Sequence, residues 1–317
     1  MPEAVESRWV RGFAGTAGDR EAEGKMDGHN FSMFSGVREH LETFRGEKFV
    51  YVPNPGNAGD SLIAHATYQF FDAMGLDYEV GDECGIYPDR AVIYGGGGNL
   101  VQPLINLRNF LINNADKCTR LTVLPQGFRD YGDEIAALGA HCTLFCRDRV
   151  AFDFARRHAR KAQVLLAHDM ALATDVGRTM ADGGRFPLPL LSNPTFARRN
   201  VRRLLRTTRA RTFPSRTLNC FRGGLEKTDI AIPRDNVDVS AIYATGRMSK
   251  DFALESTYRM MQFMDRYSVV QTNKLHVAII GILLNKRVNI FDNSYGKNRS
   301  VFEQSIDGRF PNVEWRG

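Results

Sequence analysis

Short apolar stretches alternate with amphipathic stretches along most of the chain. The first clear apolar run is Phe49–Val52, and the residues Pro53–Gly56 that follow it end any regular strand. From Asp60 to Met74, apolar residues recur at helical spacing, with Asp60 or Ser61 as a suitable N-cap. The pattern therefore predicts a strand, a tight turn and then a helix.

The same alternation continues through the rest of the chain. The predicted strands cover residues 78–80, 91–94, 120–128, 142–147, 163–167, 217–222, 267–271 and 287–291. The predicted helices cover residues 31–44, 100–113, 133–139, 150–160, 251–266 and 277–284. Strands that alternate with helices over this length predict an α/β protein with parallel sheets and helices on both of their faces.

The alternation is lost between Gly183 and Ser215, where three prolines precede an arginine-rich run. This loss predicts a boundary between two α/β domains. We expect a polar arm and lead-in helix over 1–45, an N-terminal domain over 46–185, a basic connecting segment over 186–215 and a C-terminal domain over 216–317.

Length and composition are consistent with a globular protein. A chain of 317 residues that is 43% hydrophobic can bury a sizeable core and form two domains of ordinary size. No apolar stretch is long enough to cross a bilayer, and the charged N-terminus lacks the apolar region of a signal peptide, so we expect a cytoplasmic protein. Five scattered cysteines are expected to be reduced. The net charge of +6 favours anionic partners.

The strongest basic run is Arg198–Arg211, with nearly every arginine on one side of a predicted helix. It has three interpretations: a solvated face, a contact with anionic lipid headgroups, or a contact with nucleic acid. No aromatic residue lies among the arginines, so base stacking is not expected. Between the two kinds of contact, a peripheral one with the inner face of the membrane is favoured over nucleic acid.

Two Gly-rich turns follow predicted strands. The first contains Gly56 and Gly59, and the second is Gly95–Asn99. Neither has the spacing of a dinucleotide-binding turn or a P-loop. Each is either a tight connection or a wall of one shared crevice, where glycine lets the backbone approach a bound group and a helix N-terminus favours an anion.

Cationic residues also stand where strands give way to helices. His276 lies beside Lys274 at the start of an almost wholly apolar helix, and Lys297 follows the next strand. A histidine is often only a structural residue. However, positively charged side chains gain nothing from a position at the N-terminus of a helix, which is the positive end of the helix dipole. The alternative is that His276 and both lysines bind an anion.

Other strand ends carry charged residues too. Arg147 either belongs to a surface charge cluster or makes a two-pronged contact with a carboxylate or phosphate, oriented by Asp148. His168 with Asp169 permits a similar interpretation, and Arg222 is a further candidate. The sequence contains none of the zinc or carboxylate motifs of a metal site, so we expect no metal. It also lacks the nucleophile elbow of a serine hydrolase.

Taken together, these features resemble the polysaccharide pyruvyl transferase family over about residues 46–305. The resemblance is carried by Gly56–Asp60 with Leu62 and Ile63, Gly95–Asn99, Arg147 with Asp148, Lys274–His276, and Asp292–Lys297. In two places the chain departs from the family. Lys274 stands where the family usually has arginine, and Gly224 stands where many members have aspartate.

The resemblance implies two Rossmann-like domains in a GT-B-like arrangement with the active site in the interdomain cleft. It also implies transfer of pyruvate from phosphoenolpyruvate, with no other cofactor, to two hydroxyls of a sugar. The product is a cyclic ketal on an exopolysaccharide or cell-surface glycan precursor, with a lipid-linked oligosaccharide as one form of acceptor.

On this basis the candidate residues take three roles. The catalytic residues would be His276 and Arg147; the donor-binding residues Lys274, Lys297 and Arg222; and the acceptor-binding residues Asn57, Gly59, Asp60, Gly96, Gly97 and Asn99. Histidine suits acid and base work because it ordinarily titrates near neutral pH.

Two other functions remain open. A glycosyltransferase using a nucleotide sugar could share the architecture, because a fold does not fix a function. Such an enzyme should show a carboxylate for the ribose and an apolar slot for the base, and neither is evident in the sequence. A non-catalytic sugar- or anion-binding component of polysaccharide assembly is the third possibility.

Overall fold

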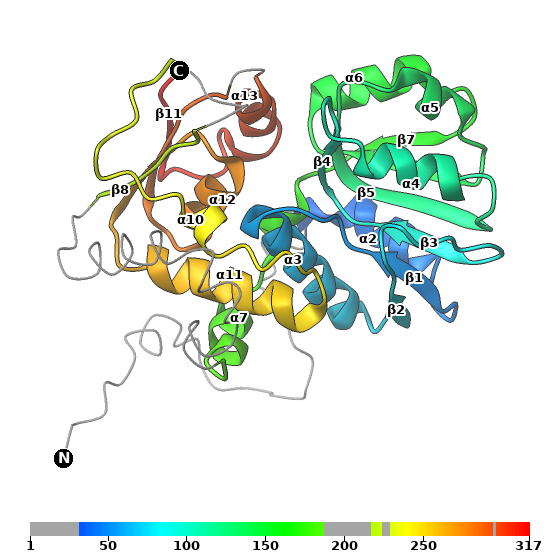
Figure 1. Cartoon of the computed structure of the whole chain (residues 1–317), viewed down its shortest axis with the longest axis horizontal. Helices are drawn as coiled ribbons and strands as arrows, with labels where there is room; N and C mark the ends of the chain where they lie inside the picture. Colours follow the sequence, from blue (N-terminus) through cyan, green and yellow to red (C-terminus); the bar gives the residue numbers. More distant parts are fainter. Residues whose placement is uncertain (1–31, 187–216, 224–228, 294–295) are drawn as a thin grey trace.

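The computed structural model describes residues 32–186, 217–223, 229–293 and 296–317, apart from the side chain of Asn99, and it contains two parallel sheets (Figure 1). The larger, seven-stranded sheet has the order β2–β1–β3–β5–β6–β7, with β4 beside β5. Its strands are β1 (Phe49–Val52), β2 (Tyr78–Val80), β3 (Ala91–Tyr94), β4 (Gly97–Leu100), β5 (Arg120–Phe128), β6 (Cys142–Cys146) and β7 (Gln163–Leu166). All their pairings are parallel, as predicted.

Helices cover both faces of this sheet, which confirms the second part of the prediction. Side chains alternate along β1, so Val50 and Val52 pack in one cluster while Phe49 and Tyr51 pack in the other. The first cluster includes residues of α4 (Asn106–Asn114), α5 (Gly132–Ala137) and α6 (Arg149–His158). The second includes residues of α2 (Ser35–Glu42) and α3 (Ala58–Met74). The helices η2 (Met170–Ala173) and α7 (Val176–Gly183) follow β7.

The smaller sheet has the order β11–β10–β9–β8 and is also parallel. Its strands are β8 (Thr217–Cys220), β9 (Val269–Thr272), β10 (Arg287–Ile290) and β11 (Val313–Trp315). The helices of this half are α10 (Val239–Ile242), α11 (Lys250–Met264), α12 (Leu275–Leu283), α13 (Lys297–Val301) and η3 (Phe302–Ile306). Both sheets are therefore built from strand–helix units in the manner of Rossmann-like folds.

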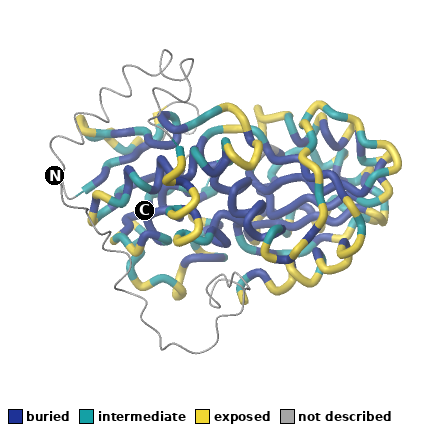
Figure 2. The backbone as a smooth tube through the Cα atoms, turned by 90° about the horizontal axis from the view of Figure 1, so that it is seen from below, coloured by how far each residue is buried: buried dark blue, intermediate teal, exposed yellow. Residues whose placement is uncertain are grey.

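Helix α3 joins the two halves. It lies between them in Figure 1, and the same hydrophobic cluster contains Leu62 of α3 and Met260 of α11. The Tyr68 hydroxyl donates a hydrogen bond of 2.8 Å to the carbonyl of Met248. Figure 2 shows the result, a buried interior that runs through both halves with exposed residues on the outer turns. Because α3 is buried on nearly all sides, it fixes the first Gly-rich turn relative to the second half.

Two local predictions about the Gly-rich turns are wrong. Helix α3 begins at Ala58, not beyond Asp60, because Asn57 is its N-cap and the Asp60 side chain completes a capping box. The second turn does not lead directly into a helix. Gly97 has a φ of +149°, which side chains rarely allow, and Gly97–Leu100 runs as strand β4 along β5. Helix α4 begins only at Asn106.

Strand β5 covers the predicted residues 120–128, and Pro125 and Gly127 lie inside it. Its pairing with β6 shifts register between Val123 and Gln126. A proline is tolerated at such an irregularity, where its missing N–H interrupts no regular ladder.

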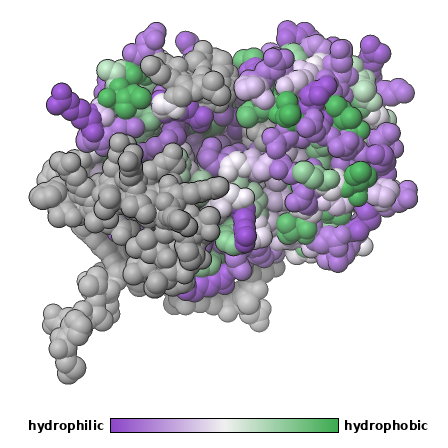
Figure 3. All heavy atoms as spheres, in the orientation of Figure 1, coloured by the Kyte–Doolittle hydropathy of each residue, from purple (hydrophilic) through white to green (hydrophobic). Residues whose placement is uncertain are grey.

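Two predicted segments lie outside the described residues. These are most of the polar arm (1–31) and the basic run Arg198–Arg211. Within the described ranges, no helix combines the length and apolar character that crossing a bilayer requires. On the face shown in Figure 3, hydrophobic residues are scattered among hydrophilic ones in the described part of the chain.

Candidate functional site

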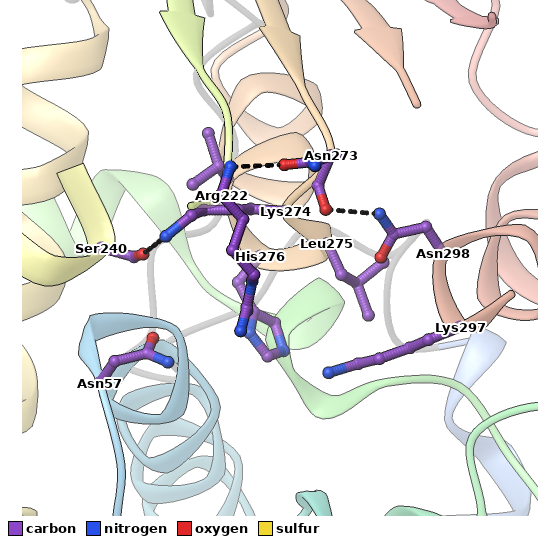
Figure 4. A pocket seen from close by; sticks show the side chains of 10 residues that line it. Asn57, Arg222, Ser240, Asn273, Lys274, Leu275, His276, Lys297 and Asn298 are labelled. Carbon is purple, nitrogen blue, oxygen red and sulfur yellow. Dashed lines mark hydrogen bonds between the residues drawn. The ribbon is translucent and has the colours of Figure 1, made fainter. Parts of the chain in front are cut away.

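A small pocket lies where helices from both halves present their first residues. It is lined by Asn57 at the start of α3, Lys274 and His276 at the start of α12, and Lys297 at the start of α13, with Arg222 after β8 (Figure 4). The carboxyl end of a parallel strand feeds each of these helices, so the strands deliver them to one place. Sequence positions from 57 to 297 thus meet around a single cavity.

Lys274 is held by its own half of the protein. Its Nζ donates to Asp238 Oδ1 at 2.6 Å and to Ser240 Oγ at 2.8 Å. Burial would raise the pKa of Asp238, but the charge and hydrogen bond of Lys274 outweigh it and lower that pKa. Two of the three ammonium donors are therefore engaged, which limits what Lys274 can offer a ligand.

Asp169 lies at the centre of the charged groups. Its Oδ2 accepts a hydrogen bond of 2.9 Å from Arg147 Nη1 and lies 3.5 Å from His276 Nε2. Its Oδ1 accepts from the backbone N–H of Ala171 at 3.0 Å. Burial alone would raise the pKa of Asp169, but His276, Arg147 and the Ala171 amide together hold it well below its usual range. Asp169 is therefore an anion that faces two candidate catalytic groups.

The expected partner of Arg147 is wrong. Asp148 caps helix α6 by accepting from the Ala151 amide at 2.8 Å, and it pairs with Arg129 Nη2 at 3.0 Å. A carboxylate directly before a helix serves the free amides of that helix. Asp169, which lies far enough along the chain to fold back, orients Arg147 instead.

The second Gly-rich turn lies against the cations. A methyl group on Gly98 would lie 2.8 Å from Arg147 Nη2 and 3.4 Å from Lys297 Nζ. Methyl groups on Gly96 and Gly97 would meet Pro125 O at 2.8 Å and Asn54 Nδ2 at 2.6 Å. Only glycine lets this segment pass so close to its neighbours.

The first Gly-rich turn approaches His276 from the opposite half. A methyl group on Gly59 would lie only 2.3 Å from His276 Nδ1. The Gly59 amide donates to Asn57 Oδ1 at 2.7 Å, and the Asn57 amide donates to Asp60 Oδ2 at 2.8 Å. These two amides are therefore unavailable to an anion, contrary to the prediction that the first amides of the helix would face one.

The Asp60 carboxyl group lies near His276, Lys297 and Arg147. Its Oδ1 accepts a hydrogen bond of 3.3 Å from Asn54 Nδ2. Asp60 is partly exposed to solvent, but most of the atoms around its carboxyl group belong to the protein. Burial therefore raises the pKa of Asp60, and His276, the Asn57 amide, Lys297 and Arg147 offset part of the rise.

Most of the candidates are thus brought together. Asn57, Arg222, His276 and Lys297 line the pocket, while Gly59 lies against His276, and Arg147 lies against Gly98 and pairs with Asp169. The Arg222 amide donates to Asn273 Oδ1 at 2.7 Å. His168 does not join them, because its Nδ1 bonds Ser305 Oγ at 2.9 Å and burial, with Arg309, lowers its pKa to about 4.

Asp169 carries more weight than its sequence position suggested. The available signal was an acid two residues after a predicted strand, next to His168. Ser240, Asn273 and Asn298 also line the pocket, and no motif marked them. Among the described residues, no group of three or more histidine, cysteine or acidic side chains is arranged to hold a metal ion.

Three comparisons with known proteins find chains that are similar to this one. A family model described as polysaccharide pyruvyl transferase matches residues 57–295, about three quarters of the chain. A Bacillus subtilis (strain 168) protein named "Putative pyruvyl transferase EpsO" is 40% identical over 50 residues, and the match covers 16% of each chain. A crystal structure titled as that of a functional uncharacterized protein from Klebsiella pneumoniae subsp. pneumoniae NTUH-K2044 is 29% identical, with a TM-score of 0.70. The match covers 90% of this chain and 98% of the other.

Proposed function

This chain belongs to the polysaccharide pyruvyl transferase family, and we propose that it transfers pyruvate from phosphoenolpyruvate to two hydroxyls of a sugar, forming a cyclic ketal. The observation that supports this most is that His276, Lys297 and Arg222 line one pocket, while buried Arg147 lies against Gly98 beside Lys297 and shares Asp169 with His276. The acceptor would be part of an exopolysaccharide or cell-surface glycan precursor.

The cations suit the donor. Phosphoenolpyruvate carries a carboxylate and a phosphate, so it requires at least two cationic contacts. Arg147 and Lys297 both lie against Gly98, and Arg222 lines the same pocket from β8. We assign these three residues to the donor, and Lys274 to a lesser part because Asp238 and Ser240 already bind its ammonium group.

His276 would move the protons. Protonated His276 gives its proton to the methylene carbon of the donor, the C=C electron pair forms the new C–H bond, and C2 becomes a cation. One sugar hydroxyl attacks C2 and returns a proton to His276. Phosphate then leaves with that proton, and the second hydroxyl attacks C2 and restores the imidazolium. Positioned proton transfer of this kind contributes ~10²–10⁴ in rate.

The acceptor would approach from the larger sheet. We propose a GT-B-like arrangement in which residues 46–185 form the acceptor side and residues 216–317 the donor side, joined by 186–215. Asn57, Gly59 and Asp60 would then meet the sugar, together with the turn that contains Gly96, Gly97 and Asn99.

The test is His276→Ala. The variant should bind phosphoenolpyruvate, measured by calorimetry, and should release no phosphate with p-nitrophenyl glycosides of galactose, glucose, mannose or N-acetylglucosamine that support turnover by the wild type. His141→Ala is the control, because His141 is exposed and its ring bonds the carbonyl of Ala115, away from the pocket. Retained turnover in His276→Ala would exclude His276 from the mechanism.

A thermal shift assay separates the alternatives. Phosphoenolpyruvate should raise the melting temperature, whereas UDP should not. Stabilisation by UDP alone would favour a nucleotide-sugar glycosyltransferase. Binding of phosphoenolpyruvate without phosphate release from any acceptor would favour a non-catalytic role.

A further inference from the structure

We propose that Asp169 is a positioning residue that holds neutral His276 in the tautomer with its proton on Nε2, so that Nδ1 is the atom that exchanges protons with the substrates. This inference rests on the proposed function. It adds which ring nitrogen of His276 exchanges protons and which residue selects that nitrogen.

The Asp169 carboxylate is held in place by groups other than His276. Both side chains of the Asp169–Arg147 ion pair are only 1% exposed. Asp169 Oδ1 is held by the Ala171 amide, and Oδ2 accepts from Arg147 while also facing His276 Nε2. Asp169 therefore cannot turn away without leaving a buried guanidinium uncompensated.

An ionised carboxylate can only accept hydrogen bonds, so the nitrogen that faces it must carry a proton. His276 Nε2 is buried and makes no hydrogen bond of ordinary geometry within the described part of the chain. Its separation of 3.5 Å from Asp169 Oδ2 needs to close by only about half an ångström to form one. Catalytic hydrogen bonds often tighten in this way when substrate binds.

The other nitrogen, Nδ1, lies on the side of the first Gly-rich turn, and His276 lines the pocket together with Asn57. Nδ1 lies against Gly59, which has no side chain to block it, and the ring stands between Asn57 and Lys297 in Figure 4. Other charged groups near His276 include Asp60 of α3, Arg147, which shares Asp169 with it, and Arg222 and Lys274, which line the same pocket. With the proton on Nε2, neutral imidazole presents its lone pair at Nδ1, on the side of Gly59, which we assign to the acceptor.

Nitrogen-15 NMR tests the tautomer without any turnover. Uniformly labelled wild-type protein is compared with His276→Gln to assign the ring signals, and two-bond proton–nitrogen couplings identify the protonated nitrogen at a pH where His276 is neutral. We expect a protonated Nε2 and an unprotonated Nδ1. A proton on Nδ1 overturns the proposal, whereas absence of phosphate release in the wild type would count only against the proposed function.

Asp169→Asn tests the residue itself. Asparagine keeps the volume and can still accept from the Ala171 amide, but its amide can donate to Nε2 and so favours the other tautomer. We expect kcat to fall ~10²–10⁴-fold, in line with the loss of an orienting carboxylate elsewhere, with a smaller change in KM for phosphoenolpyruvate.

The matched control is Asp175→Asn, which replaces the carboxylate that caps α7 through the Arg178 amide, away from the pocket. Its kcat should equal that of the wild type. A folded Asp169→Asn variant with wild-type kcat, or with an unchanged His276 tautomer, overturns the proposal. If that variant does not fold, the wild-type spectrum still decides.

Discussion

Gly59→Ala would insert one methyl group between the two halves of the site. The added carbon would lie 2.3 Å from His276 Nδ1, 2.9 Å from its Cγ and 3.0 Å from Asn57 Oδ1. Non-bonded carbon contacts are ordinarily about 3.5–4.0 Å, so the imidazole must move by roughly 1 Å. A misplacement of that size can reduce a rate ~10²-fold. Stability should change little, because alanine is favoured over glycine in a helix by ~1 kcal/mol, which offsets the crowding.

The assay compares kcat for phosphate release, the affinity for phosphoenolpyruvate by calorimetry, and the melting temperature. Gly177→Ala is the matched control. Gly177 is also the second residue of a helix that follows a side-chain cap, but a methyl group there would lie 3.5 Å from its nearest neighbour, Asp175 Oδ1. We expect Gly177→Ala to keep full activity with equal or greater stability, and Gly59→Ala to lose ~10² in kcat while it still binds the donor.

A Gly59→Ala variant with kcat within threefold of the wild type would refute the reasoning. It would mean either that the imidazole tolerates a shift of 1 Å or that another group moves the protons. Loss of activity together with a large drop in melting temperature would instead trace the effect to folding.

Three further outcomes are expected. Burial lowers the pKa of His65 from 6.5, its value in the unfolded chain, to about 3. Below pH 6.5 the unfolded chain therefore binds a proton at His65 that the folded chain does not bind. Stability should therefore fall by ~1.4 kcal/mol per pH unit between pH 6 and pH 4 from this residue alone, and equal urea midpoints at pH 7 and pH 5 would contradict it. Asp238→Ala removes the acidic partner of buried Lys274 and should lower the unfolding free energy by ~1.5–3 kcal/mol in urea titrations; an unchanged midpoint would show the ion pair to be unimportant. Gly98→Ala crowds Arg147 Nη2 and should raise KM for phosphoenolpyruvate about tenfold or more, whereas unchanged affinity would remove Arg147 from the donor site.

Much of the fold is predictable from local pattern. Apolar runs bounded by proline and glycine gave the order of strands and helices, because each element buries its own apolar side. The errors concern ends and short elements. The cap Asn57 was missed because Asp60, its partner in the capping box, has equally good cap chemistry. Strand β4 was missed because its glycines carry no apolar signal, and its pairing with β5 is a contact between segments far apart in the sequence.

The site is predictable only in part, for a related reason. The strand-end positions of Arg147, His276 and Lys297 could be read from the chain, because parallel strands deliver their carboxyl ends to one edge. Their partners could not. Asp148 is adjacent to Arg147 but serves helix α6, while Asp169 reaches His276 across more than a hundred residues. Such pairings depend on packing between elements.

The burial of α3 on nearly all sides also bears on how the protein is made. The helix leaves the ribosome well before α11, which covers it in the finished molecule. Until then its apolar surface is open to chaperones and to aggregation. A fragment that ends after the larger sheet would keep α3 with its apolar surface exposed and would lack His276. We therefore expect the protein to function only as an undivided chain.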